Sequence, residues 1–562
     1  MKSIRDGKVH PYVPELYNQF LKGEVDRREF LRTSTLLGVS AAAAYAMVGQ
    51  VTGESFVPQA QAATPKMGGI LRASMRVQEM VDPATFSWTQ MSNQSRGFLE
   101  YLTHTGTDNV TRPYLAEKWE ASDDLKTWTL HLRKGVKWNN GDDFGADDVV
   151  YNFERWLDEA TGSSNIGLFA AMTEAYDTGK KKDGKAVMGK KMIANAVEKV
   201  DGNTVRLNLS RPVLAIPENL YNYPTAMVHR KFGDMGGDLS KNPIGTGPFK
   251  MTEYKVGEKF SLRKRDGYWG RAAYLDGVDY FDHGDDPSAM LNALISGQVD
   301  HAYEVTINQI DLIEKVPTLD LHETVTAQTG VARMQVDQKP FDDVRVRQAI
   351  QACIDHEALL KIAYRGRGAA AEDHHVSPIH PEYYKLPAQK VDIAKAKKLL
   401  ADAGHKDGLT IKIDFGQADA WHAAAVQAMK QQLAPAGINM ELNPMPGATY
   451  WDVWDKTPMG FTSWTHRPLG VMVLDLGYRG GVPWNESHYN NPEFDKALDE
   501  AGATLDVKER QKKMQKVESI LQNDAVIVQP LWRAVFDATN KKVQGHKVHP
   551  TQYHQFQNVW LS

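Results

Sequence analysis

The stretch from Asn242 to Gly270 constrains the fold more than any other part of the sequence. It begins with Asn-Pro-Ile-Gly-Thr-Gly-Pro, in which each proline fixes its own φ and each glycine tolerates positive φ, so the chain must turn here. Alternating apolar residues follow on both sides of a second turn at Lys255–Glu258. The stretch carries no nucleophile, general base or metal-ligand set. It therefore predicts a rigid turn and a β-hairpin that serve as a scaffold.

The same stretch resembles a segment of the family 5 extracellular solute-binding proteins, the peptide- and nickel-binding subunits of ABC importers. The resemblance rests on N-P-I-G-T-G-P-F at Asn242–Phe249 and D-G-Y-W at Asp266–Trp269. Two further segments match in the family's order, L-A-E-K-W at Leu115–Trp119 and R-K-G-V-K-W at Arg133–Trp138. The resemblance implies an α/β fold with two lobes, the type II, cluster C-like periplasmic binding protein architecture, with an extra subdomain in the first lobe. It also implies a ligand held between lobes that close by hinge motion.

Length and composition narrow the possible functions. A chain of 562 residues is too long for one core and predicts two or three domains. The formal net charge of -4 leaves no basic footprint, so nucleic acid is not an expected partner. The single cysteine, Cys353, lies on the apolar stripe of a predicted helix and is expected to be buried. Since the motifs of hydrolases, metalloproteases and dinucleotide-binding enzymes are lacking, we expect no catalytic activity. We also expect a monomer without a resident metal or cofactor.

The N-terminus predicts export from the cytoplasm. D-R-R-E-F-L-R at Asp26–Arg32 resembles the twin-arginine signal, with Arg27 and Arg28 as the arginine pair. The following run to Val51 is too weakly apolar for a membrane anchor, and A-Q-A predicts cleavage between Ala62 and Ala63. We therefore expect the twin-arginine translocase to deliver the protein to the periplasm of a Gram-negative cell. The alternative is a basic amphipathic helix at the start of a cytosolic protein.

Four regions are expected along the chain: a signal peptide at 1–62, a first lobe at 63–326, a second lobe at 327–525, and a return to the first lobe at 526–562. The inserted subdomain is placed at about 107–205. There, alternation on both sides of Lys134-Gly135 predicts a hairpin that joins Trp128–Leu132 to Val136–Trp138. Gly184–Lys191 nearly matches a phosphate-binding loop, but Lys191 replaces the required Ser or Thr, so a solvated charge run is expected.

The second lobe is predicted to contain a βαβ unit. Residues 411–415 and 438–442 have strand character and flank a helix at 421–435. A strand, a crossover helix and a second strand imply parallel pairing.

Two turn-rich stretches of this lobe carry the candidate solute-binding residues. Ser463–Gly470 and Leu476–Asn485 combine aromatic side chains with arginines among residues typical of exposed turns. Exposed aromatics beside cations indicate a binding surface more often than a core. The candidates are Trp464, Arg467, Tyr478, Arg479 and Trp484, with Trp421 of the same lobe as a further member. The alternative, that each tryptophan belongs to the core, stays open.

The resemblance also indicates the charge of the solute. Dipeptide-binding members carry an Asp for the peptide ammonium where this chain has Arg467, and an Arg for the carboxylate near the position of Gln417. Arg467 would repel an ammonium but could hold a carboxylate through paired hydrogen bonds. We therefore expect Arg467, with Arg479, to hold an anionic or carbonyl-rich part of the solute, with Trp464 and Trp484 beside it. The alternative is that Arg467 pairs with a protein carboxylate such as Asp475.

The expected solute is a peptide or peptide-like molecule that is passed to an ABC permease in the inner membrane. A non-peptide organic anion or a metal chelate is the alternative. Glu79, at the start of a predicted loop, completes the expected ligand-binding set. His374, His375 and His380 lie in a polar loop, where they are expected to be solvated, and a metal role for them stays open.

Overall fold

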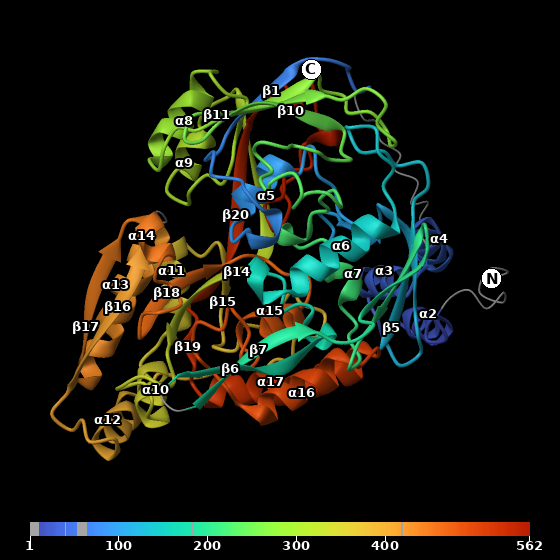
Figure 1. The fold of residues 1–562 in the computed structure, drawn as a ribbon. Coiled ribbons are helices and arrows are strands. Elements are labelled where there is room, and N and C mark those ends of the chain that lie inside the picture. Colours follow the sequence, from blue (N-terminus) through green and yellow to red (C-terminus); the bar gives the residue numbers. More distant parts are fainter. Residues whose placement is uncertain (1–9, 40, 53–63, 183–184, 418–419) are drawn as a thin grey trace. The chain divides into compact units, whose positions relative to one another are not determined.

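The computed structural model describes residues 10–39, 41–52, 64–182, 185–417 and 420–562 (Figure 1). The chain forms two compact units in which helices and strands are mixed. Unit 1 comprises Met1–Glu304, Leu312–His322 and Asp537–Ser562, and unit 2 comprises Val305–Asp311 and Glu323–Phe536. The chain therefore passes between the units several times, so neither unit is one continuous stretch.

Unit 2 extends further toward the C-terminus than the sequence predicted. The return to the first lobe was expected at residue 526, whereas unit 2 ends at Phe536. The reason is strand pairing: β19 (Ile527–Val528) pairs with β14 (Leu319–Met334) at Ala332 and Arg333. The first residues of β20 (Leu531–Asn540) pair with β15 (Gly368–Ala370). These ladders hold residues 527–533 in unit 2.

The sheet of unit 1 contains the hairpin predicted from Asn242–Gly270. β10 (Phe249–Lys255) and β11 (Lys259–Lys264) pair antiparallel, which confirms it. β11 continues antiparallel to β12 (Gly277–Phe281), and β1 (Ile70–Ser74) lies parallel between β12 and β13 (His301–Ala302). β13 then pairs antiparallel with the end of β20, at Ala538 and Thr539.

The Gly-Thr-Gly turn packs directly on the backbone at Phe98. A Cβ atom added at Gly245 would lie 1.9 Å from the carbonyl oxygen of Phe98, a distance that no side chain can adopt. The amide of Gly247 donates a hydrogen bond to that same oxygen at 2.9 Å. Beyond the hairpin, the Tyr268 hydroxyl and the Trp269 indole N–H donate to the buried carboxylate of Glu100 at 2.6 and 2.8 Å. The stretch Asn242–Gly270 thus makes a close backbone contact with Phe98 and two hydrogen bonds to the buried Glu100.

A separate four-stranded sheet in unit 1 spans residues 116–208. Its order is β4 (Ala116–Ala121), β5 (Thr127–Leu132), β9 (Thr204–Asn208) and β8 (Val197–Asp201), all antiparallel. The hairpin expected across Lys134-Gly135 is wrong, because β5 pairs with β4 and β9 instead. Val136 and Trp138 are buried outside any strand. The apolar alternation therefore continues past β5 because Val136 and Trp138 are buried, not because they belong to a strand.

The amphipathic helix α6 (Ala146–Leu157) and a hairpin, β6 (Thr173–Lys182) with β7 (Lys185–Met192), complete this region. Lys185–Lys191 lies in strand β7 and no helix follows it, so the residues of the phosphate-loop match that the structure describes lack the required loop-to-helix geometry.

The described residues of the N-terminus include three helices that belong to unit 1: α2 (Val13–Leu21), α3 (Arg27–Leu36) and α4 (Ala41–Thr52). Asp26 caps α3 by accepting the amide of Glu29 at 2.9 Å, and Arg27 and Arg28 are exposed. The indole N–H of Trp119 donates to the Leu36 carbonyl at 2.7 Å. Ala62 and Ala63 lie outside the described residues. No helix within the described ranges is long and apolar enough to span a membrane.

Unit 2 contains the predicted βαβ unit. β16 (Leu409–Gly416), α13 (Ala420–Leu433) and β17 (Ile438–Met445) follow one another, and the two strands pair in parallel, which confirms the prediction. β18 (Met459–Trp464) lies between β16 and β14. Unit 2 also contains the helices α10 (Val344–Gln351), α11 (His356–Tyr364), α12 (Ile393–Asp402), α16 (Pro492–Gly502) and α17 (Val507–Asn523). Cys353 is buried as expected, and burial raises the pKa of its thiol to about 12.

Candidate functional site

The candidate residues of unit 2 begin where β18 ends. β18 stops at Trp464, and a loop leads to α15 (Gly470–Gly477). Two buried histidines hold the loop. Nδ1 of His466 accepts the amide of Ala327 at 3.0 Å, and Nε2 of His380 lies 3.0 Å from the carbonyl oxygen of Arg467. The loop therefore has a defined path although it contains turn-forming residues.

A buried ion pair orients Trp464. Nε of Arg333, on β14, lies 2.9 Å from Oε2 of Glu486, and both side chains are buried. The same carboxylate accepts the hydroxyl of Thr462 at 2.6 Å and the indole N–H of Trp464 at 2.8 Å. Burial raises the pKa of Glu486, and Arg333 and these two donors oppose the rise. Removing either member of this ion pair would leave an uncompensated buried charge, so the pair keeps the Glu486 carboxylate in place. The carboxylate in turn holds the Trp464 indole through its hydrogen bond.

His375 belongs to a cluster of aromatic side chains. The Trp464 ring lies edge-on to the rings of His375 and Trp484, with centroids 5.4 and 6.0 Å apart. Nδ1 of His375 is 2.7 Å from the hydroxyl of Tyr478. Burial, together with nearby positive groups, lowers the pKa of His375 well below its usual value, so the imidazole is neutral at pH 7. We call these four residues, Trp464, Trp484, His375 and Tyr478, the aromatic cluster.

The two candidate arginines have different surroundings. Arg467 is buried and donates from Nη1 to the hydroxyl of Thr465 and to the carbonyl of His466. Arg479 forms ion pairs with Asp475 at 2.5 Å and Asp499 at 2.7 Å, which raise the pKa of its guanidinium further. Asp475, the carboxylate named as an alternative partner of Arg467, is thus paired with Arg479.

The other candidate residues come from other elements of the chain. Trp421, on α13, packs its ring against His422 and Phe461 at centroid distances of 4.5 and 5.6 Å. Gln417 is exposed at the carboxyl end of β16, where its amide donates to the Met445 carbonyl. Glu79 is exposed in unit 1, shortly after β1. The structure therefore gathers Trp464, Tyr478 and Trp484, and it places Trp421 in a different ring cluster of unit 2.

Two expectations about exposure are wrong. Trp464, Tyr478 and both arginines are buried rather than displayed on turns, and only Trp484 is half-buried. The histidines of the polar loop are buried as well: His374, His375 and His380 are 1%, 1% and 4% exposed. The reason is Asp373, whose carboxylate accepts the amide of Gln529 at 2.7 Å and lies 3.0 Å from Nε2 of His356. These contacts draw the loop into unit 2.

Three residues that shape this site were not predicted to do so: Arg333, Glu486 and His375, the last considered only as a metal ligand. Arg333 had a detectable signal, because it interrupts the apolar run Val331-Ala332-Arg333-Met334 of a buried strand. An arginine there requires a buried acceptor. Glu486 lies in a polar turn and had no such signal.

Unit 1 contributes a second polar feature, a small cavity beside the Asn242–Gly270 motif. It is lined by Arg96, Glu100, His104 and the phenol rings of Tyr101 and Tyr221, among others. The guanidinium carbon of Arg96 lies 4.3, 4.7 and 3.5 Å from the ring centroids of Tyr101, Tyr221 and Tyr553. The phenol, imidazole and guanidinium groups that line this cavity are of kinds that can stack on a small molecule or hydrogen-bond to it.

Comparison with known proteins identifies the family. The model of the bacterial extracellular solute-binding proteins, family 5, matches residues 111–474, well over half of the chain. The dipeptide-binding protein of Escherichia coli K12 is 27% identical over 483 residues, covering 81% of this chain and 86% of that protein. Heme-binding protein A of Haemophilus influenzae is 27% identical over 482 residues, covering 80% and 83%.

A solved structure has the same fold. The periplasmic binding protein DppA of Helicobacter pylori, in complex with the peptide STSA, superposes with a TM-score of 0.75 at 23% identity. The match covers 88% of this chain and 98% of that one. The two-lobed α/β fold expected from the resemblance is therefore confirmed. The chain belongs to the bacterial extracellular solute-binding proteins of family 5.

Proposed function

We propose that this protein is the periplasmic solute-binding component of an ABC importer and that it captures a peptide or peptide-like solute. The observation that carries the proposal is the family match over residues 111–474, together with the dipeptide-binding relative that aligns over most of both chains. Such proteins bind and release a solute without making or breaking bonds. The partner that receives the solute is the permease in the inner membrane.

The aromatic cluster and Arg467 are the proposed solute-binding groups of unit 2. Glu486 fixes the indole of Trp464, and His375 lies against both Trp464 and Tyr478. Fixed aromatic rings lose little conformational entropy when a solute stacks on them. The positive charge of Arg467 suits a carboxylate or carbonyl group of the solute.

The second candidate is an organic anion or a metal chelate carried by the same kind of importer. One observation favours it: an arginine, Arg467, stands where the dipeptide-binding relatives are expected to carry an aspartate. A relative named as a heme-binding protein supports it as well. In this case the cationic side chain would contact the acidic periphery of the ligand.

Identifying the bound solute tests both candidates. Protein purified from the periplasm under mild conditions is denatured, and the released small molecules are identified by mass spectrometry. A peptide or peptide derivative supports the first candidate, and a non-peptide anion or a chelate supports the second. Release of a covalently modified product, with turnover on prolonged incubation, would contradict a pure binding function.

Export by the twin-arginine translocase completes the proposal. Arg27 and Arg28 are exposed on the first turn of α3, where a receptor can reach both guanidinium groups. If the segment up to Ala62 is removed after transport, the remaining chain would be a soluble protein of the periplasm.

A further inference from the structure

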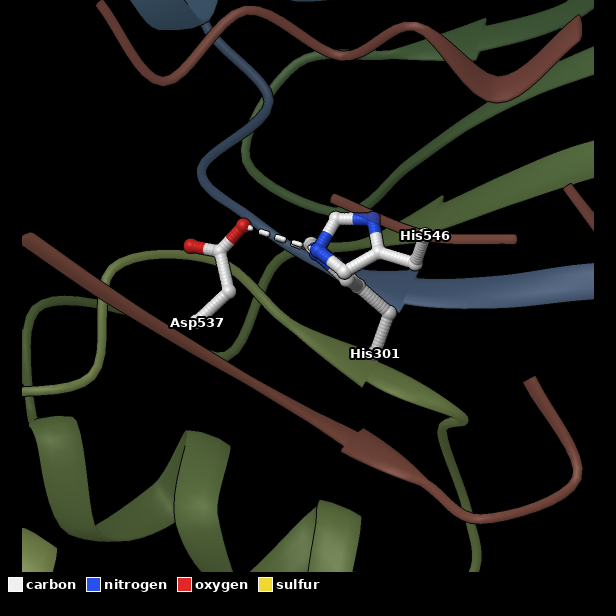
Figure 2. Close-up of side chains that lie close together, drawn as sticks. All are labelled: His301, Asp537 and His546. Atoms are coloured by element: carbon white, nitrogen blue, oxygen red, sulfur yellow. Dashed lines mark hydrogen bonds and ion pairs between the residues drawn. The ribbon is translucent and has the colours of Figure 1, made fainter. Parts of the chain in front are cut away.

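Three side chains in unit 1, none of them a candidate solute-binding residue, point toward one another. They are His301 on β13, Asp537 on β20 and His546 in the segment after β21 (Val543–Gln544) (Figure 2). Each offers one ligand atom, and the three atoms lie within 4.8 Å of one another. We propose that His301, Asp537 and His546 form a binding site for a divalent transition-metal ion, of which Zn²⁺ is the representative case.

The distances fit metal coordination better than ordinary hydrogen bonding. Nε2 of His301 and Nε2 of His546 each lie 3.3 Å from the same oxygen, Oδ2 of Asp537. A charge-assisted N–H···O bond is shorter, at about 2.7–2.9 Å. Zinc bonds to nitrogen and oxygen of about 2.0–2.2 Å place neighbouring ligands of a tetrahedral site about 3.3–3.6 Å apart. An ion can therefore fit between the three atoms with small side-chain adjustments.

One of the ligand atoms has unused binding capacity. Within the described part of the chain, Nε2 of His546 makes no hydrogen bond, although the side chain is only 6% exposed. The acceptor that faces this nitrogen is Oδ2 of Asp537 at 3.3 Å, a separation too long for a well-formed hydrogen bond. A metal ion would bind Nε2 of His546 and also Oδ2 of Asp537, the oxygen that both imidazoles face.

The surrounding residues hold the ligands in place. Oδ1 of Asp537 accepts the amide of Glu304 at 3.1 Å, which leaves Oδ2 turned to the imidazoles. Glu304 has a φ of +52°, a conformation that a glutamate rarely adopts. In this conformation its amide donates the hydrogen bond to Asp537. The ring of His301 packs against His554 and Phe556 at centroid distances of 5.1 and 5.3 Å. The hydrogen bond to Asp537 is of the kind that orients a metal-ligating carboxylate, and the ring packing restricts rotation of the His301 side chain.

The ligand set selects the class of ion. Two imidazoles and one carboxylate suit Zn²⁺, Co²⁺, Ni²⁺ or Cu²⁺, whereas Mg²⁺ and Ca²⁺ require more oxygen ligands. Three protein ligands leave one position for water. His322 lies close by, with its ring 5.0 Å from that of His546, but its Nε2 is 2.8 Å from the Thr539 hydroxyl. We therefore assign His322 to the surroundings of the site.

The position along the chain suggests what the ion would do. Asp537 is the first residue of unit 1 after the chain leaves unit 2, and His301 lies just before Glu304, where the chain leaves unit 1. A metal ion would link these two segments and the residues around His546 within unit 1. We therefore expect it to stabilise unit 1 at the ends of the connecting segments.

Metal titration of the full-length chain, purified without a polyhistidine tag and treated with a chelator, tests the site. Zn²⁺ bound after dialysis is counted by atomic emission, and Co²⁺ is used as a visible-light probe of coordination by nitrogen and oxygen. We expect one ion per chain and a higher Tm in its presence. His546→Ala and Asp537→Asn should weaken binding by about 100-fold or more and abolish the cobalt spectrum.

His405→Ala is the matched control, because it removes an imidazole from unit 2 and should leave metal binding unchanged. His546 is the primary variant because it is the most accessible of the three ligands; circular dichroism verifies that each variant is folded. Wild-type protein that binds none of the four ions at tens of micromolar overturns the proposal, as does unchanged binding in both variants. Solute binding by the metal-free protein is measured separately, so failure of the metal site and failure of the proposed transport function are distinguishable.

Discussion

At the scale of single residues, the proposal assigns to Arg467 the choice of which charge the solute can carry. Its guanidinium is buried beside the loop that follows β18, so an ammonium placed against it would be strongly repelled. The proposed solute therefore presents a carboxylate or carbonyl group to this arginine. Dipeptides that bind with their ammonium at Arg467 are incompatible with this arrangement.

Arg467→Ala and Arg467→Asp are expected to weaken solute binding by at least about tenfold, since a hydrogen bond to a charged group contributes about 1.5–3 kcal/mol. Isothermal titration calorimetry with the solute identified by mass spectrometry measures the effect. Arg345→Ala, which removes an exposed arginine from α10 of the same unit, is the control and should bind normally. Unchanged affinity in Arg467→Ala rules out the proposed contact.

A second residue-scale prediction concerns Glu518 on α17. Its carboxyl group is fully buried, accepts the amide of Tyr384 at 3.1 Å, and has a pKa raised to about 9 by burial. The unfolded chain releases this proton near pH 4.5, but the folded protein retains it up to about pH 9. The native state therefore loses stability relative to the unfolded state as the pH rises between these values.

Glu518→Gln keeps the shape but cannot ionise, so it should gain stability relative to wild type as the pH rises from 5 to 8. Urea unfolding of both proteins at the two pH values measures the difference. Glu509→Gln, at an exposed position of the same helix, should show no comparable trend. A stability difference that is the same at pH 5 and pH 8 contradicts the predicted ionisation.

At the scale of elements, the Gly-Thr-Gly turn depends on close packing against Phe98. Gly245→Ala is expected to destabilise unit 1 by at least about 1–3 kcal/mol, because the added methyl group meets backbone that cannot move aside. Thermal unfolding measures the loss. Gly202→Ala is the matched control: no atom lies within 4 Å of its added Cβ, and its stability should change by less than about 0.5 kcal/mol. Equal Tm values for the two variants would refute the packing argument.

The prediction about export concerns two arginines of helix α3. Replacing Arg27 and Arg28 by lysine keeps the charge but removes the planar guanidinium groups that distinguish arginine. We expect the double variant to remain in the cytoplasm with its N-terminal segment uncleaved, as seen by fractionation and N-terminal sequencing. Lys22→Arg, an exposed position between α2 and α3, should be exported normally. A normal periplasmic yield of the double-lysine variant argues against this route.

At the scale of the whole molecule, the proposed function is capture without chemistry. Saturating solute should stabilise the folded protein by mass action, by about 2.7 kcal/mol at a hundredfold excess over Kd. Differential scanning calorimetry measures the gain, and a smaller radius of gyration in solution scattering would report closure of the two units. A solute that binds without changing either quantity contradicts capture by closure, and a solute that is consumed contradicts a binding protein.

Features that depend on neighbouring residues could be predicted from local patterns in the sequence. The hairpin β10–β11 follows from alternation on both sides of a turn, and the parallel pair β16–β17 follows from the helix between the strands. The cap of α10 is equally local, because Asp343 accepts the amide of Arg345 two residues away. The family itself could be recognised from short segments whose turns and aromatic residues are encoded in consecutive positions.

Tertiary structure alone decided the features that join distant residues. Arg333 and Glu486 are 153 residues apart, and His301 and Asp537 are 236 apart. No local periodicity encodes such pairs, since they meet only when strands from different parts of the chain come together. The burial of His374, His375 and His380 has the same origin, because contacts of Asp373 with Gln529 draw a polar loop inward. Unit 2 likewise extends to Phe536 because β19 and β20 pair with β14 and β15, strands that lie far earlier in the chain.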